Sequence, residues 1–300
     1  MREFNPFLLR HLGIYYMLIA SFYNACLGFL AKILSQNLHS FEIVFWRNLI
    51  GLFIVLLAIK KDKECDFLRG GHMCLLLFRG FIGVCGMAAF FYNIANAGLS
   101  MAFAFYKTAP IFTALIAGFF FAQKLRALSW FAILLGFVGF LLTAQPSGGF
   151  ALTDIIGIIG GLCSGAALAS VHELRKYYKA NSIVLSYMIA GTLLMAVLLI
   201  LGELYSSDSG LLKGVKFSFP NAYEWLLLGL VALGGYYFQL YLTKAFAASK
   251  KAGIIASISY SDVIFAMIFG LFLGEALPNF IALCGIFVIA LSGVLLAKQK

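Results

Sequence analysis

Charged residues are scarce in this sequence. They make up 11% of the 300 residues, whereas hydrophobic residues make up 63%. Soluble domains carry about a quarter charged residues and close to half apolar ones. The excess apolar surface excludes a soluble protein and requires a lipid bilayer as a partner. The net charge of +10 does not indicate a nucleic-acid partner, because the charges occur in short clusters between apolar runs rather than on one face.

Motifs for metals, redox chemistry and ATP are also missing. The six cysteines show no CxxC spacing, and the four histidines are scattered without an HExxH motif. There is no GxxxxGKS/T loop, and no carboxylate or Cys/His cluster suggests a nucleophile. We therefore expect no cofactor, no metal site and no catalytic residues. The first apolar run is too long for a cleavable signal, so we expect it to be a membrane span.

Long apolar runs fill the rest of the chain. A helix needs roughly 20 apolar residues to cross the hydrocarbon core, and the period-2 alternation of barrel strands is absent. The expected fold is therefore an all-α polytopic membrane protein with ten transmembrane helices. The expected ranges are 12–34, 40–59, 73–96, 100–122, 128–144, 153–176, 183–203, 223–247, 252–273 and 278–297.

Basic residues in the loops predict the orientation. If the N-terminus is cytoplasmic, only Lys213 and Lys216 face outward. Positively charged loops favour the cytoplasmic side, so both termini are expected there. Fifteen basic residues then face the cytoplasm: Arg2, Arg10, Lys60, Lys61, Lys63, Arg69, Lys124, Arg126, Arg175, Lys176, Lys179, Lys250, Lys251, Lys298 and Lys300.

The two halves of the chain are related by an internal repeat. The segment APIFTALIAGFFFAQKL (109–125) aligns without gaps on SDVIFAMIFGLFLGEAL (261–277), 152 residues later, which places Pro110 on Asp262. We expect two repeats of five helices, residues 1–146 and 147–300. An odd number of helices per half means that the second is inserted upside down. Inverted repeats around a midplane site are typical of secondary transporters.

Four segments carry a likeness to a known family. They are SFEIVFWRN (40–48), the run from Arg79 through residue 125, KAFAASKKAGIIASISY (244–260) and LFLGEAL (271–277). With these segments the chain resembles the EamA proteins of the drug/metabolite transporter superfamily. The resemblance implies ten helices, cytoplasmic termini, a bacterial inner membrane, and a central cavity lined by the third, fourth, eighth and ninth spans. It also implies substrates such as amino acids, S-adenosylmethionine or riboflavin.

The sequence departs from the family pattern at two places. Gln123 and Lys124 stand where the first repeat usually has a Gly-Glu-like pair, and Asp262 stands where many members have proline. Charges inside spans are costly and usually face a cavity or a partner. We expect Asp262, near the middle of the ninth span, to pair with Lys107 or to bind a cationic group of the substrate. The alternative is a buried structural pair.

Other charged and kinking residues lie in the spans. Arg79 either lines the cavity or has a structural or snorkelling role. Arg47 is expected to be structural and to pair with Glu42 or Asp262. Pro110 cannot donate a hydrogen bond, so we expect it to kink the fourth span near the midplane.

Polar aromatic residues complete the predicted substrate site. Mixed aromatic and hydrogen-bonding linings suit small amphiphilic molecules, although each residue has helix packing as an alternative role. The predicted substrate-binding residues are Asp262, Lys107, Tyr106, Tyr92, Asn96, Arg79, Tyr260, Tyr237 and Gln239.

These features predict a secondary transporter that works by alternating access. It would move a small polar or amphiphilic metabolite across the cytoplasmic membrane. An acid beside lysine and arginine in an aromatic cavity suits a zwitterion, such as an amino acid or an amino-acid-derived compound. A proton or a counter-substrate is the candidate coupled species, and the chain is expected to be a monomer or a homodimer. The alternative is a membrane-embedded enzyme or lipid-handling protein, which would need a convergent acid, base or metal set.

Overall fold

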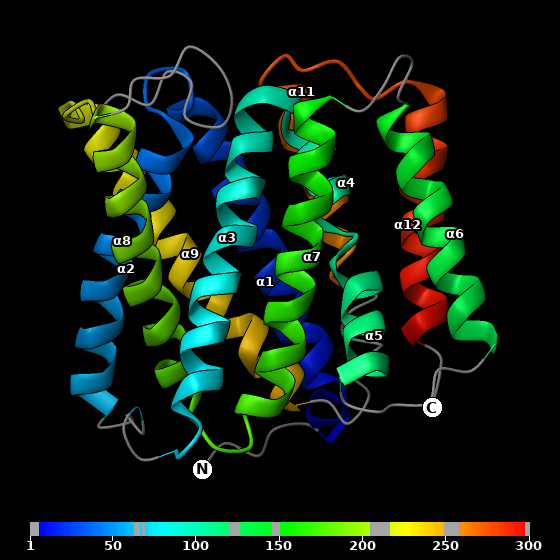
Figure 1. Cartoon of the computed structure of the whole chain (residues 1–300), viewed down its shortest axis with the longest axis horizontal. Coiled ribbons are helices and arrows are strands. Elements are labelled where there is room, and N and C mark those ends of the chain that lie inside the picture. The colour runs from blue at the N-terminus through cyan, green and yellow to red at the C-terminus, as the bar shows by residue number, and fades with distance from the viewer. Residues whose placement is uncertain are drawn as a thin grey trace.

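A computed structural model describes residues 6–62, 67, 70–120, 127–145, 151–204, 217–248 and 258–297. Within these ranges the regular structure is entirely helical (Figure 1). The helices are α1 (Pro6–Leu34), α2 (Ser40–Asp62), α3 (Met73–Ala97), α4 (Leu99–Tyr106), α5 (Ala109–Phe120), α6 (Ala127–Ala144), α7 (Leu152–Leu174), α8 (Ala180–Leu204), α9 (Ala222–Ala248), α11 (Ser261–Phe272) and α12 (Phe280–Ala297).

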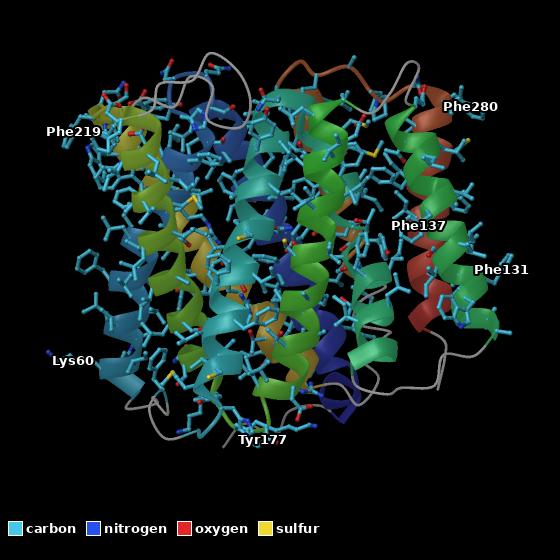
Figure 2. The ribbon with its side chains drawn as sticks, in the orientation of Figure 1. Lys60, Phe131, Phe137, Tyr177, Phe219 and Phe280 are labelled. Atoms are coloured by element: carbon cyan, nitrogen blue, oxygen red, sulfur yellow. The ribbon has the colours of Figure 1, made fainter. Side chains whose placement is uncertain are left out.

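Six of these helices are long and apolar enough to cross a bilayer: α1, α2, α3, α7, α8 and α9. The outer surface is covered by large apolar side chains, and Phe280 is 79% exposed. Figure 2 shows Phe131 and Phe280 pointing away from the bundle at one edge. Such a surface is unfavourable in water and suits lipid. The chain is therefore an all-α polytopic membrane protein, as expected.

The fourth predicted span is interrupted. One helix was expected over 100–122, but α4 ends at Tyr106 and α5 begins at Ala109. The interruption lies just before Pro110, which has no amide hydrogen to donate to the carbonyl of Tyr106. The hydroxyl of Thr108 donates instead to the carbonyl of Phe105, 2.7 Å away. The expected kink is thus a complete break in the helix.

The ninth span is interrupted at the matching position of the repeat. Ser259 and Tyr260 form a turn, and α11 begins at Ser261. The first part of this predicted span, residues 252–257, lies outside the described residues. At the repeat spacing of 152, Ser259 and Tyr260 correspond to Lys107 and Thr108. Two broken helices therefore face each other, because α4 contacts α11.

Contacts between helices are matched across the two halves. Helix α1 packs against α9 as α3 packs against α7, and α1 packs against α11 as α7 packs against α5. The helix pairs α2–α8 and α6–α12 each join one helix from either half and form opposite edges of the bundle (Figure 1). Helix α1 begins and α12 ends at the same face. The interior is therefore built jointly by residues from both halves.

Close helix packing at one edge depends on glycine. A Cβ atom added at Gly139 of α6 would lie 2.8 Å from the backbone nitrogen of Ile289 and 2.9 Å from the carbonyl oxygen of Gly285, both in α12. Small residues let the backbones of membrane helices approach closely. This pairing holds α6 against α12, beside the broken helices.

Candidate substrate-binding site

The two broken spans are joined by a buried ion pair. The ammonium nitrogen (Nζ) of Lys107 lies 2.9 Å from Oδ2 of Asp262, and the two side chains are 7% and 1% exposed. Asn24 of α1 donates from Nδ2 to the same carboxylate oxygen at 2.9 Å. The hydroxyl of Tyr260 donates to the backbone carbonyl of Lys107 at 3.2 Å. We call these four residues the ion-pair site.

Helix ends explain why these charges occupy these positions. Lys107 follows the C-terminus of α4, where the helix dipole favours a cation. Asp262 lies in the first turn of α11, where the dipole favours an anion. The breaks therefore create an environment for both charges that an uninterrupted apolar helix would not offer. Asp262 was expected near the middle of the ninth span, and the structure adds that α11 begins at this point.

An open groove lies beside the ion-pair site. Its volume of about 550 Å³ falls in the range of small-molecule sites. Lys107 and Tyr260 form part of its wall, and the rest is mainly apolar. The other lining residues come from α1, α4, α11, α12 and the residues next to α11: Leu18, Ala104, Ile258, Ser261, Val263, Ile264, Met267, Leu283, Ile286, Phe287, Ile289 and Ala290.

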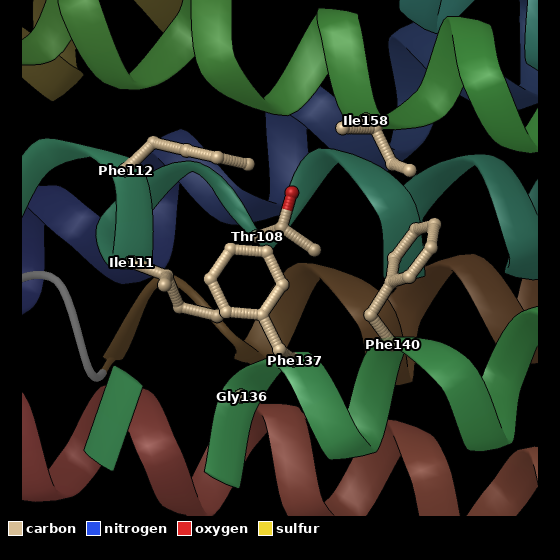
Figure 3. A pocket seen from close by; sticks show the side chains of 7 residues that line it. All are labelled: Thr108, Ile111, Phe112, Gly136, Phe137, Phe140 and Ile158. Atoms are coloured by element: carbon tan, nitrogen blue, oxygen red, sulfur yellow. The ribbon is translucent and has the colours of Figure 1, made fainter. Parts of the chain in front are cut away.

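A second, much smaller pocket lies on the other side of the break. It is lined by Thr108, Ile111, Phe112, Gly136, Phe137, Phe140 and Ile158. Figure 3 shows the ring of Phe137 rising from α6 toward Thr108, and the ring of Phe140 rising from the same helix toward Ile158. Its volume of about 10 Å³ corresponds to roughly one water molecule. This pocket is too small for a metabolite.

Two buried arginines share one tyrosine ring. The guanidinium carbons of Arg79 (α3) and Arg47 (α2) lie 5.0 and 5.6 Å from the ring centroid of Tyr187 in α8. Arg79 donates from Nη2 to Oε1 of Gln239 in α9 at 3.1 Å. Arg47 donates from Nη1 to the hydroxyl of Tyr187 at 3.3 Å and to Oδ1 of Asn48 at 3.0 Å. We call Arg47, Asn48, Arg79, Tyr187 and Gln239 the arginine cluster.

Neither arginine has an acidic partner in the part of the chain that the structure describes. The ion pairs found there are Lys32–Glu275, Lys107–Asp262 and Lys176–Glu173. Burying one ion costs several kcal/mol, whereas a cation–π contact contributes about 0.5–2 kcal/mol. The contacts with Tyr187 therefore do not offset the burial of both charges.

The expected partners of Arg47 prove wrong. Glu42 instead accepts a hydrogen bond from the indole nitrogen of Trp46 at 3.3 Å and another from the amide of Ser218 at 3.3 Å. Asp262 is engaged by Lys107 and Asn24. Both carboxylates are therefore held by other groups, and Arg47 faces α8 and α9.

Tyr106 connects the ion-pair site and the arginine cluster. Nζ of Lys107 lies 5.6 Å from the centroid of its ring. The same ring packs against the buried core cluster that contains Tyr187. Six predicted site residues, Asp262, Lys107, Tyr260, Tyr106, Arg79 and Gln239, therefore belong to one connected polar interior.

Three predicted site residues lie elsewhere. Asn96 is exposed near the end of α3, and its amide donates to the carbonyl of Tyr92 at 2.8 Å. Tyr237 stacks on Tyr23, with ring centroids 5.5 Å apart, and on Tyr241 at 6.2 Å. No described contact joins these residues to the ion pair or to the arginines.

Sequence reasoning missed Asn24 and Tyr187 as site residues. Both are polar groups within apolar runs, so the cost of burying a polar group in lipid was an available signal. It could not be used without knowing which way each helix faces. Arg47 was noticed but was assigned to structural pairing.

Comparisons with known proteins agree with this architecture. Residues 11–145 match the EamA-like transporter family. An uncharacterized transporter of Helicobacter pylori strain J99 is 30% identical over 291 residues, covering 95% of this chain and 94% of its own length. The chain belongs to the EamA-like transporter family. One solved crystal structure shares the fold of this EamA protein, with a TM-score of 0.61 and 18% identity over 96% of this chain and 95% of the other.

Two relatives of this EamA protein have named substrates. The pseudopaline exporter CntI of Pseudomonas aeruginosa is 24% identical and aligns over 96% of both chains. The S-adenosylmethionine uptake transporter of Rickettsia conorii is 23% identical over 92% of this chain and 89% of its own length. One of these relatives exports its substrate and the other imports it. Family membership therefore indicates a transporter, but it does not indicate the direction of transport or the substrate.

Proposed function

We propose that this EamA transporter moves a zwitterionic, amino-acid-like metabolite across the bacterial inner membrane by alternating access. The observation that carries the proposal is the buried Lys107–Asp262 ion pair at the junction of two interrupted helices. Interrupted helices that expose charged ends and free backbone groups near midplane form the substrate sites of many secondary transporters. The adjacent groove offers space for a small molecule.

A zwitterion suits this site because it can replace both partners of the ion pair. The ammonium of the solute would take the place of Lys107 on Asp262, and its carboxylate would receive the ammonium of Lys107. Each buried charge then keeps an opposite charge, so the exchange avoids the several kcal/mol that an unpaired buried ion costs. A neutral solute would separate the pair without compensating either residue.

Alternating access would follow from two inverted repeats, residues 1–146 and 147–300. The matched packing of the two halves supports this division. The ion pair links α4 of the first repeat to α11 of the second, so solute binding would act on a contact between repeats. Both termini would lie in the cytoplasm, which the loop charges favour.

Energy coupling would follow from the state of the empty site. When the solute leaves, Lys107 and Asp262 neutralise each other, so the empty carrier can reorient without exposing a charge to lipid. This favours transport down the gradient of the solute or exchange of one solute for another. Proton coupling would appear as solute movement driven by a pH gradient alone.

The test uses the full-length protein in proteoliposomes. Uptake of labelled amino acids and S-adenosylmethionine would be measured with and without unlabelled solute inside. Asp262→Asn should abolish transport, whereas Asp154→Asn, which changes an acid at the start of α7, should retain it. Wild-type transport rates in Asp262→Asn would contradict the proposal.

A further inference from the structure

We propose that the arginine cluster is a second, anion-binding subsite, and that the transported solute therefore carries an ammonium group and at least two carboxylates. This inference rests on the proposed function, because it places the two subsites around one solute. It goes further by assigning a binding role to Arg47, Arg79, Tyr187 and Gln239, and by giving the solute a net negative charge.

The free hydrogen-bond donors of the arginines carry the inference. Nε and Nη2 of Arg47 are buried without a partner, and so are Nε and Nη1 of Arg79. Arg47 and Arg79 are 0% and 4% exposed. Nε and Nη2 form one edge of a guanidinium, the edge that binds a carboxylate through two parallel hydrogen bonds. Arginine stays protonated in proteins, so neither residue can escape the cost of burial by losing its charge.

The guanidinium edge of Arg47 lies against the backbone of α9. A Cβ atom at Gly235 would lie 2.6 Å from Nε and 2.7 Å from Nη2 of Arg47, too close for any side chain at this position. The two donors therefore face a glycine rather than a hydrogen-bond acceptor, which explains why they have no partner. An anion would reach this edge by moving the guanidinium away from α9.

The charges around the two sites indicate what the acceptor is. Both guanidinium groups lie over the ring of Tyr187, and no acid of the described residues lies within ion-pair distance of either arginine. Arg47, Arg79 and Lys107 bring three positive charges, and Asp262 brings one negative charge. These four buried residues therefore carry a net charge of +2, which one zwitterion leaves unchanged.

A solute with two carboxylates and one ammonium fits both sites together. Its ammonium would bind Asp262, and one carboxylate would accept from Lys107. The second carboxylate would reach past Tyr106 to the arginines, because the Tyr106 ring lies between Lys107 and the core cluster that contains Tyr187. A carboxylate accepts two parallel hydrogen bonds from a guanidinium edge; a phosphate can do the same and is therefore included as a probe.

Binding to the purified full-length protein tests this separately from transport. The probes are L-aspartate and L-glutamate, each beside its side-chain amide, L-asparagine or L-glutamine, and inorganic phosphate. Ligand binding raises the unfolding temperature by mass action, and calorimetry gives Kd. At least one acid should bind about tenfold or more tightly than its amide, because the amide cannot make the charge-assisted pair.

Variants then assign the preference to the arginine cluster. Arg79→Gln and Arg47→Gln should each abolish the preference for the acid. They should also raise the unfolding temperature of the empty protein, because each removes a buried unpaired charge. Gly235→Ala should weaken binding of the acid, because its methyl group would displace the guanidinium of Arg47. Lys244→Gln, which removes an exposed cation near Tyr241, should leave the preference intact.

Several outcomes would overturn the inference. The inference fails if neither acid binds more tightly than its amide. It also fails if the arginine variants still prefer the acid. Lower stability of the empty arginine variants would indicate a structural role. If phosphate binds as tightly as the acids, the cluster recognises a phosphate group rather than a carboxylate of the solute. Binding of the acids without transport would instead contradict the proposed function and leave the subsite standing.

Discussion

Removing one partner of the Lys107–Asp262 pair should destabilise this protein more than removing both. Asp262→Asn keeps an acceptor for the amide of Asn24 but leaves the ammonium of Lys107 buried without an anion, since that side chain is only 7% exposed. Breaking a buried pair in this way costs about 3–5 kcal/mol. For a chain of this size, that loss lowers the unfolding temperature by about 6–20 °C.

The double variant Lys107→Met/Asp262→Asn separates pairing from the mere presence of charge. It removes both charges and retains an acceptor for Asn24, so its stability should return to within about 1 kcal/mol of wild type. The change in unfolding free energy of the double variant, minus the sum of the changes for Lys107→Met and Asp262→Asn alone, gives the coupling energy between the two residues. Thermal unfolding of the purified protein at pH 7 measures all four states of this cycle.

Transport by the same four proteins gives the functional half of the test. The double variant should be stable and inactive, because it lacks both charges of the ion pair that the solute would replace. Two results would refute the reasoning. One is an Asp262→Asn protein as stable as wild type, which would mean that the ammonium of Lys107 finds another partner. The other is a double variant that transports at the wild-type rate.

Three further predictions concern stability alone. Burial lowers the pKa of the His39 imidazole, whose Nδ1 accepts from the amide of Phe41 at 3.2 Å. The stability that the neutral imidazole contributes is complete above its ordinary pKa of about 6.5 and is lost as the pH falls below that value. His39→Asn should therefore reduce the change in unfolding temperature between pH 7 and pH 5. Gly139→Val should separate α6 from α12 and cost about 3 kcal/mol or more, whereas Gly229→Ala, with open space around it, should be neutral or slightly stabilising in thermal unfolding. Glu275→Gln should lower the free energy of unfolding by about 1 kcal/mol. Its carboxylate oxygens accept from the amide of Leu99 at 2.9 and 3.1 Å, and one of them lies 3.6 Å from Nζ of Lys32. Lys176→Gln, which removes the cation of an exposed ion pair, is the matched control.

The spans and the distortion of the fourth one could be predicted because they depend on local chemistry. The sixth span was expected over 153–176, and the helix found there, α7, runs from Leu152 to Leu174. Pro110 predicted a kink in the fourth span because proline lacks an amide hydrogen, and the structure has a break at this place. The repeat then placed Asp262 opposite that break, which is how the pairing with Lys107 could be proposed from sequence and is found in the structure.

Helix rotation could not be predicted in the same way. In water, the apolar face of a helix points inward, but in a bilayer both the lipid and the bundle interior are apolar. The sequence therefore did not reveal that Tyr187 faces Arg47 and Arg79, or that Asn24 faces Asp262. The same ambiguity explains Asn96, which shares a helix face with Tyr92 but uses its amide on its own helix.

The polar interior combines one neutral site and one charged site, and this difference assigns them different roles. The Lys107–Asp262 pair is electrically neutral without a ligand, so in the proposed mechanism it would break and reform as the carrier works. The arginines keep unpartnered donors in the empty protein. In the proposed mechanism, a solute anion bound there would stabilise a closed form by differential affinity, the requirement for a ligand to shift a conformational equilibrium. The ion pair would then govern exchange of the ammonium group, while the arginines would favour closure around the anionic end.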